Sequence, residues 1–285
     1  MSRIYNQASI SYNYCNNRGN AISNIAITNL QEPFTITKYT LDSTYRYNDE
    51  ITYIVNIQNN SLCCNECPIV LFDDLGSFVE NDVTITPLTY VGSSRIFNPE
   101  NNTFVEITPK IEPHGICFDI PPLNCNCQKS LILIYKVKVN EYAPIDVCSQ
   151  ITNTITATAC ECSIESSTTI NSEEYADIEI YKYMTPCLVT NCSPITYTFT
   201  ISNSGNAEAT NIEFTDKFTP APTNISVYVQ GTLLSPTDYS YENGLLTIPA
   251  SYNLSIPPAT ITRNTTTNEI EVLPSIITIE VVGTL

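Results

Sequence analysis

Apolar and polar residues alternate along several segments of this chain, and the same series of segments occurs twice. Every second residue is apolar in residues 51–58, and residues 195–202 repeat this pattern with threonine and serine between the apolar positions. A period of two indicates a strand with one buried face, because successive side chains of a strand point to opposite faces. Each copy therefore contains a half-buried strand.

The segments around these two strands also correspond. Each copy begins with an apolar strand that includes a lysine, at residues 34–38 and 177–182. Each copy also has a long apolar run near its end, at residues 131–139 and 276–282. This order of segments predicts two copies of one β-rich repeat.

The two copies end differently. The first copy continues into another alternating segment, residues 150–158, whereas the chain ends at Leu285 directly after the apolar run of the second copy. The second copy is therefore about one strand short, which predicts an open sheet edge. Such an edge is a template for pairing with a strand of another chain.

A candidate for the missing strand precedes the first copy. Residues 20–28 alternate and belong to neither copy, and Ile22-Ser23-Asn24 resembles Ile151-Thr152-Asn153. The predicted donor residues are Asn20, Ile22, Asn24, Ala26 and Thr28. Donation of this strand to the next subunit would grow a filament, because a head-to-tail contact that does not close into a ring continues. The alternative is a floppy tail, or a strand that folds back on its own chain.

Length and composition set the domain organisation. The chain has 285 residues, which is enough for two domains with buried cores. We predict an N-terminal donor strand or tail in residues 1–30, a cysteine-rich first repeat in residues 31–172, and a second repeat without its last strand in residues 173–285. Helical periodicity is lacking. The predicted fold is all-β, with two tandem immunoglobulin-like β-sandwich domains, the second completed by an N-terminal strand from another subunit.

Charge and hydropathy exclude two classes of partner. The net charge of −17 argues against nucleic acid, whose binding requires clustered lysine and arginine. No apolar run approaches the ~20 residues of a membrane helix. The first residues have no apolar core typical of a signal peptide. The predicted partner is another copy of the chain, with no nucleic acid and no membrane.

Twelve cysteines conflict with the missing signal, because disulfides persist in oxidising surroundings. The candidates for disulfides are Cys15, Cys63, Cys64, Cys67, Cys117, Cys125, Cys127, Cys148, Cys160, Cys162, Cys187 and Cys192. Cys15, Cys187 and Cys192 are the candidates for bridges between subunits. The groups at 63–67 and 125–127 could instead hold zinc, but C-x-C is a poor chelating spacing. We favour disulfides and predict no metal and no cofactor.

Catalytic residues are not indicated. His114 is the only histidine and precedes Cys117 by three residues, in a segment rich in proline and glycine. A cysteine nucleophile needs a base that is held by a third group. Asp73 and Asp74 could bind a cation, but neighbouring strand residues face opposite sides. We predict that the chain is not an enzyme.

Residues 177–182, 194–205 and 209–216 carry a family resemblance. They form a strand ending in lysine, a threonine-rich alternating strand that closes in an Asn-rich turn, and a strand ending in aspartate. This resembles the bacterial surface repeat known as domain of unknown function eleven. The first copy matches more loosely. The resemblance implies an immunoglobulin-like sandwich that serves as a spacer or building block on a bacterial surface.

A cysteine-rich chain with two copies and no signal peptide is similar to clostridial spore-surface proteins. This similarity implies synthesis in the mother-cell cytoplasm and oxidation of the thiols after the cell lyses. It further implies a self-assembling subunit of a spore appendage, stabilised by disulfides, with other spore-coat or exosporium proteins as further partners. One alternative is a two-dimensional exosporium lattice. Another is a surface adhesin or glycan-binding module that uses the 18 tyrosines, although tyrosines on such strands more often belong to cores and interfaces.

The resemblance also implies a covalent possibility. Some sandwich domains of bacterial surface fibres join a first-strand lysine to a last-strand asparagine, with help from a buried acid. The matching residues are Lys38, Asp73 and Asn153 in the first copy, and Lys182 and Asp216 with a neighbour's Asn24 in the second. The alternative is that the lysines extend to water at strand ends and the asparagines face solvent.

Overall fold

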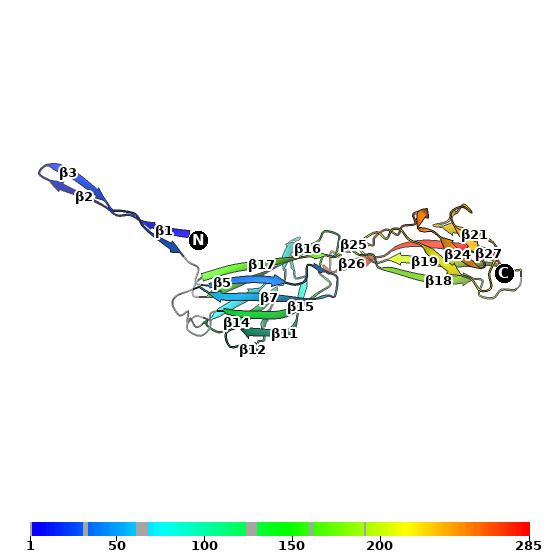
Figure 1. Ribbon diagram of the computed structural model, residues 1–285, viewed down its shortest axis with the longest axis horizontal. Coiled ribbons are helices and arrows are strands. Elements are labelled where there is room, and N and C mark those ends of the chain that lie inside the picture. The colour runs from blue at the N-terminus through cyan, green and yellow to red at the C-terminus, as the bar shows by residue number, and fades with distance from the viewer. Residues whose placement is uncertain (1, 31–33, 61–67, 124–129, 160–161, 191) are drawn as a thin grey trace. The chain divides into compact units, whose positions relative to one another are not determined.

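The computed structural model describes residues 2–30, 34–60, 68–123, 130–159, 162–190 and 192–285 (Figure 1). In this part of the chain every element is a β-strand except one 3-10 turn, Ala250–Tyr252. The prediction of an all-β fold with two tandem sandwiches is confirmed. No helix of the described residues is long and apolar enough to cross a membrane.

Residues 2–30 form a two-stranded ribbon (Figure 1, blue). Strand β1 (Ser2–Asn6) pairs with β4 (Ala26–Leu30), and β2 (Ser9–Tyr14) pairs with β3 (Asn17–Ile22). Cys15 and Asn16 make the turn with positive φ angles of 45° and 73°. Two consecutive positive φ angles are typical of the turn that best matches the twist of a hairpin.

This ribbon differs from the single donor strand expected at residues 20–28. Asn20 pairs with Ser11 and Thr28 pairs with Ile4, so the segment is the return arm of a hairpin. Asn24 lies between β3 and β4 and outside both. The large apolar side chains of the ribbon are exposed: Ile4, Tyr5, Ile10, Tyr12, Tyr14, Ile22, Ile25 and Ile27.

The first sandwich has two sheets. One sheet has the order β12 (Thr103–Glu106), β11 (Leu88–Asn98), β15 (Ser130–Val139), β7 (Glu50–Asn59), β5 (Phe34–Thr40). The other has the order β13 (Lys110–Glu112), β14 (Gly115–Ile120), β8 (Ile69–Asp73), β16 (Gln150–Ala159), β17 (Cys162–Ser172), β6 (Thr44–Tyr45). Residues alternate between buried and exposed along β5, β7, β8, β15 and β16, as the period of two predicts. A short hairpin, β9 (Phe78–Glu80) and β10 (Val83–Ile85), is separate.

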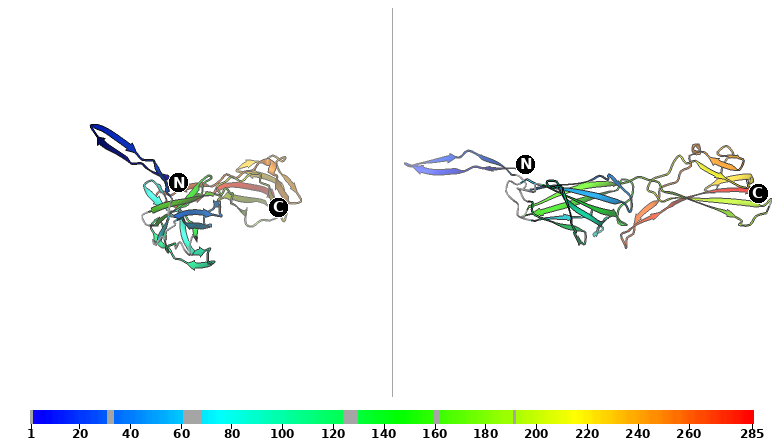
Figure 2. Two further views of the ribbon diagram at one scale, coloured as in Figure 1. Left: turned by 60° about the vertical axis from the view of Figure 1, so that its left-hand side comes forward. Right: turned by 60° about the horizontal axis from the view of Figure 1, so that its bottom comes forward.

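The second sandwich is smaller. Its larger sheet has the order β18 (Ile178–Thr185), β19 (Pro194–Asn203), β27 (Ser275–Thr284), β21 (Thr223–Val229), β22 (Thr232–Leu233). Facing it is a sheet with the order β20 (Phe214–Lys217), β24 (Leu245–Ile248), β23 (Ser240–Glu242). A further hairpin consists of β25 (Thr260–Arg263) and β26 (Ile270–Leu273). Apolar residues from both sheets form one core cluster. The strands of this sandwich carry the yellow-green to red colours in both views of Figure 2.

One edge of the second sandwich is open. In the first sandwich β8 lies between β14 and β16, but β20, which takes the place of β8, pairs only with β24 among the described strands. All eight residues of β18 are exposed, whereas β5 alternates between buried and exposed residues. The second sandwich thus has no described counterpart of either β16 or β17, so two strands are missing rather than the one predicted from the sequence.

Residue contacts divide the chain differently from the repeats. The first compact unit comprises Met1–Asp42, Glu50–Lys138 and Thr152–Thr169. The second comprises Ser43–Asp49, Val139–Ile151 and Ile170–Leu285. Three segments of the first repeat therefore belong to the second unit: residues 43–49, 139–151 and 170–172.

Candidate functional site

A lysine and an aspartate meet in the interior of the first sandwich. Lys38 comes from β5 in one sheet and Asp73 from β8 in the other, and Lys38 Nζ lies 2.5 Å from Asp73 Oδ2. Both side chains are 0% exposed. Removing two charges from water is costly, and only additional hydrogen bonds and close contact offset that cost.

The Asp73 carboxylate has further partners. The Leu75 backbone N–H donates to its Oδ1 at 3.0 Å, and the Tyr135 hydroxyl donates to its Oδ2. Burial, reinforced by the nearby aspartate, raises the pKa of Tyr135 well above its ordinary value, so Tyr135 remains a donor. Burial also lowers the pKa of Lys38, and Asp73 opposes that shift. These groups hold the carboxylate in one position.

Asn153 lies on the inner face of β16 and is fully buried. Ile155 is opposite Asp73 in the sheet, which places Asn153 two residues along on the same face. Neither its amide nitrogen nor its amide oxygen has a hydrogen-bond partner among the described residues. An unsatisfied buried polar group costs about 1–3 kcal/mol. The structure therefore brings Lys38, Asp73 and Asn153 together, and it does not place Lys38 or Asn153 in solvent.

Aromatic rings surround these three residues. Lys38 Nζ lies 4.6 Å from the centre of the Tyr53 ring. Tyr53 and Tyr135 are opposite each other on β7 and β15, with ring centres 5.8 Å apart, and Phe118 is 5.4 Å from Tyr135. Sequence reasoning missed the two tyrosines as members of the site. The alternation of apolar residues marks both as inward-facing, but it does not indicate what they contact.

The second sandwich contains half of this arrangement. Lys182 Nζ on β18 lies 2.6 Å from Asp216 Oδ2 on β20, with the side chains 35% and 17% exposed. The lysine also lies over the rings of Tyr197, Phe199 and Phe218, at 5.2, 5.1 and 4.9 Å. The described part of the second sandwich has no strand in the place of β16, so no asparagine stands where Asn153 stands in the first.

The cysteines are divided between described and undescribed residues. Cys15 lies at the turn of the N-terminal hairpin, and Cys187 and Cys192 lie between β18 and β19. These three, together with Cys117, Cys148 and Cys162, are unpaired. Cys63, Cys64, Cys67, Cys125, Cys127 and Cys160 lie outside the described residues, so disulfide pairing stays a prediction, and the zinc alternative falls there as well. No group of three or more metal-ligating side chains occurs within the described ranges.

Cys117, Asp74 and His114 were the other candidates for chemistry. Burial raises the pKa of the Cys117 thiol, which disfavours the thiolate that a nucleophile requires. The Asp74 Oδ1 accepts the backbone N–H groups of Gly76 and Thr154. His114 lies in the turn between β13 and β14, with its Nδ1 3.4 Å from Thr86 Oγ1.

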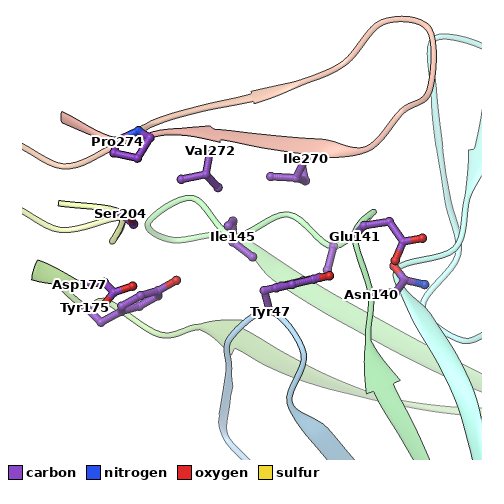
Figure 3. Close-up of a pocket in the computed structure, with 11 residues that line it drawn as sticks. Tyr47, Asn140, Glu141, Ile145, Tyr175, Asp177, Ser204, Ile270, Val272 and Pro274 are labelled. Atoms are coloured by element: carbon purple, nitrogen blue, oxygen red, sulfur yellow. The ribbon is translucent and has the colours of Figure 1, made fainter. Parts of the chain in front are cut away.

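A cavity of about 420 Å³ lies in the second compact unit (Figure 3). It is lined by Tyr47, Asn140, Glu141, Ala143, Ile145, Tyr175, Asp177, Ser204, Ile270, Val272 and Pro274. Tyr175 is held by Arg46, whose guanidinium lies 4.2 Å from the centre of its ring and forms an ion pair with Glu173 at 2.7 Å. Tyr47 and Tyr175, which line the cavity, are the tyrosines best placed for the glycan-binding alternative. The lining residues do not indicate which ligand the cavity would bind.

No family model matches the chain, and no curated protein is significantly similar to it. The resemblance to the surface repeat therefore stays a prediction. Among solved structures, the major pilin subunit BcpA of Bacillus cereus is 16% identical, with a TM-score of 0.38, over 87% of this chain and 66% of that one. The pilus backbone RrgB of Streptococcus pneumoniae is 12% identical, with a TM-score of 0.35, over 85% of this chain and 55% of that one.

The major pilin SpaD of Corynebacterium diphtheriae is 10% identical to this chain, with a TM-score of 0.32, over 84% of this chain and 61% of SpaD. This chain thus spans less than two thirds of the length of each of these three pilins. Similarity at this level carries no argument about function.

Proposed function

We propose that the chain is a self-assembling structural subunit of a surface fibre, in which the hairpin of residues 2–30 from one subunit fills the open edge of the second sandwich of the next. One observation carries this proposal. Among the described strands, the second sandwich has no counterparts of the paired strands β16 and β17, and residues 2–30 form a separate pair of arms.

The acceptor edge exposes residues that belong in a core. When Lys182 is aligned with Lys38, Ile178 and Ile180 correspond to Phe34 and Ile36. Phe34 and Ile36 are 1% and 9% exposed, whereas Ile178 and Ile180 are 43% and 55% exposed. A donated hairpin that covers Ile178 and Ile180 would remove their apolar surface from water. Its backbone would pair with the free backbone groups of the open edge strand, β20.

The first arm of the hairpin suits the place of β16. The Ile-x-Asn sequence of Ile151 and Asn153 recurs there as Ile4 and Asn6. Both Ile4 and Asn6 lie on one face of β1, as Ile151 and Asn153 do on β16. Asn6, rather than Asn24, would then occupy the position of Asn153. The opposing arm presents the small residues Ala26 and Thr28 on that same face.

The orientation of β16 and β17 predicts how the hairpin enters. In the first sandwich, β16 ends and β17 begins near Phe34 of β5. Phe34 pairs with Asn59, the last residue of β7, and Thr158 of β16 pairs with Val70, near the start of the next strand, β8. A hairpin in the same orientation would bring its Cys15 turn to the Ile178 end of β18. Its open end would lie near residues 186–193.

The cysteines and the place of the fibre complete the proposal. Cys187 and Cys192 are exposed in the loop beside which the donated hairpin would enter, and Cys15 would lie at the opposite end of the groove. Cys15 would therefore form its disulfide with a different cysteine from those that bond to Cys187 and Cys192. The twelve cysteines are the reason for placing the fibre on a spore, where lysis of the mother cell would oxidise them.

Deletion of residues 1–30 tests the proposal. The truncated protein should stay a folded monomer by circular dichroism and light scattering, while the full chain forms fibres visible by negative-stain electron microscopy. Truncated subunits added to the full chain should shorten the fibres, because they accept a hairpin but donate none. Normal fibres from the truncated protein would refute hairpin donation, and flat arrays from the full chain would favour the lattice alternative.

A further inference from the structure

The first sandwich has an exposed sheet edge that the proposed function does not use. Strand β12 is the outermost strand of its sheet and pairs only with β11 among the described strands (Figure 1). We propose that β12 pairs antiparallel with β12 of a second copy of this chain, with Phe104 opposite Phe104. This contact would join fibres side by side, whereas hairpin donation would lengthen them.

Large apolar side chains are exposed along this side of the sandwich. All four residues of β12 are exposed, with Phe104 at 59% and Val105 at 60%. Ile111 on β13, the edge strand of the facing sheet, is 69% exposed. Exposed apolar patches mark sites of association, and an unprotected edge strand is a template for pairing.

Val105 and Ile111 are exposed although both lie on the inner faces of their sheets. Val105 is opposite Ile96 and Ile111 is opposite Ile116, and these two partners are buried. A hollow of about 380 Å³, lined in part by Val105 and Leu131, lies beside β12. A strand added next to β12 would extend the sheet, and its inner-facing side chains would lie against this uncovered apolar surface.

The backbone of β12 has hydrogen-bonding groups that point away from β11. The Ile107 N–H donates to the Ser94 carbonyl oxygen at 3.1 Å, which makes these two residues a hydrogen-bonded pair. Bonded and non-bonded pairs alternate along an antiparallel ladder, so Phe104 and its partner Phe97 are a non-bonded pair. The N–H and C=O of Phe104 therefore face the open side. Two copies of Phe104 placed opposite each other can exchange both hydrogen bonds.

The side chains match in this register. Phe104 lies next to Phe97 on the outer face, with ring centres 4.6 Å apart. Two-fold pairing would place both pairs of rings in one row across four strands. Thr103 would be opposite Val105 of the second copy on the inner face. Aromatic pairs across neighbouring strands stabilise a sheet, so this register is favoured over a shifted one that places Phe104 opposite Glu106.

The charges of β12 permit two copies to meet, although the chain carries a net charge of −17. Glu106 is the only charged residue of β12 and pairs with Arg95 at 3.2 Å. In the two-fold register Glu106 would be opposite Asn102 of the second copy, so like charges are not opposed. The edge therefore fits a second copy of itself, as a two-fold contact requires.

The small size of the contact determines where it acts. A pair of four-residue strands buries much less than the ~1,200–2,000 Å² of a stable interface, so free subunits should stay monomeric in dilute solution. A fibre would repeat the edge along its length, and repeated weak contacts add up to high avidity. The contact closes after two copies, because the same edge is used by both. We therefore expect fibres to associate in pairs.

Photo-crosslinking of the full-length chain tests the contact. Benzoylphenylalanine in place of Phe104 would be activated in a concentrated mixture of light and heavy isotope-labelled copies. We expect linked peptides that join residue 104 of one copy to residues 102–106 of another. The same photoreactive residue in place of Val79, which is 71% exposed on β9, should form no links to that segment.

The absence of links between copies would overturn the proposal, and so would links from residue 104 only to other segments. Links to residues 2–30 of another copy would assign the edge to the N-terminal hairpin. A concentrated solution brings the edges together whether or not fibres grow, so this result is independent of hairpin donation.

Negative-stain electron microscopy of fibres gives a second readout. Phe104→Lys should leave fibre length unchanged and abolish pairing, because a lysine at the edge opposes a second lysine across the two-fold axis. Val79→Lys, the matched control, should retain paired fibres. Fibres of the Phe104→Lys protein that pair as the wild type does would contradict the proposal.

Discussion

Burial distinguishes the two lysine–aspartate pairs at the scale of single residues. Lys38 and Asp73 are 0% exposed, and Lys182 and Asp216 are partly exposed at the open edge. Water screens the second pair, whereas a low-dielectric interior strengthens every interaction of the first. The same two residue types therefore form a closed site in one sandwich and an incomplete one in the other.

Removing the buried lysine should be costly. Lys38→Met leaves the Asp73 charge buried without a cation, so we expect the free energy of unfolding to fall by about 3–5 kcal/mol in urea denaturation. Lys136→Met is the control, because Lys136 pairs with Glu50 where the side chains are 45% and 55% exposed. Its effect should stay within about 1 kcal/mol. Equal effects of the two substitutions would contradict the role assigned to Lys38.

The sequence was informative about this site only in part. Lys38, Asp73 and Asn153 were selected because the family resemblance implies a lysine, an acid and an asparagine at these places in the repeat. Tyr53 and Tyr135 could not be assigned to the site, because their contacts depend on how one sheet faces the other. The partial exposure of Lys182 reflects the absence of counterparts of β16 and β17 among the described strands of the second sandwich.

At the scale of elements, the N-terminal hairpin is the largest departure from the sequence expectation. The alternation in residues 20–28 predicts a strand but does not identify its partner. The preceding residues, 2–14, also alternate, and Cys15 and Asn16 form the tight turn between the two arms. Gly19 permits this pairing, because a Cβ there would lie 2.6 Å from the Tyr12 ring.

The separated hairpin should bind the acceptor edge. A peptide of residues 1–30 should bind the truncated protein in titration calorimetry, because it restores the two missing strands. Ile180→Asp should abolish binding by placing a charge where the hairpin would pack. Ile111→Asp, at a position of the first sandwich that is 69% exposed, should leave binding unchanged. Equal binding by both variants would show that the peptide binds elsewhere.

At the scale of the whole molecule, the proposed function gives the chain a donor in the hairpin of residues 2–30 and an acceptor in the second sandwich. Because these two surfaces differ, each contact leaves one donor and one acceptor free, and growth continues unless a ring closes. The repeated pattern in the sequence predicted the all-β class and the two sandwiches. It could not predict that residues 43–49 and 139–151 belong to the second compact unit, since alternation indicates which face of a strand is buried and not which distant residues it contacts.

Assembly should complete the half-site of the second sandwich. If a donated Asn6 takes the position of Asn153 beside Lys182 and Asp216, fully reduced fibres should give a ladder of covalent multimers in denaturing gels. Asn6→Ala and Lys182→Ala should each remove the ladder without preventing fibre formation. Asn24→Ala should preserve it, and loss of the ladder in that variant would instead assign the reaction to the asparagine expected from the sequence.

Site-specific photo-crosslinking tests hairpin donation most directly. A photoreactive amino acid in place of Tyr12 would be activated in fibres assembled from a mixture of light and heavy isotope-labelled subunits, and the linked peptides identified by mass spectrometry. The account predicts links to residues 178–180 of a different subunit, at the end of β18 to which the Cys15 turn is assigned. Links confined to the same subunit, or to the first sandwich of a neighbour, would contradict it.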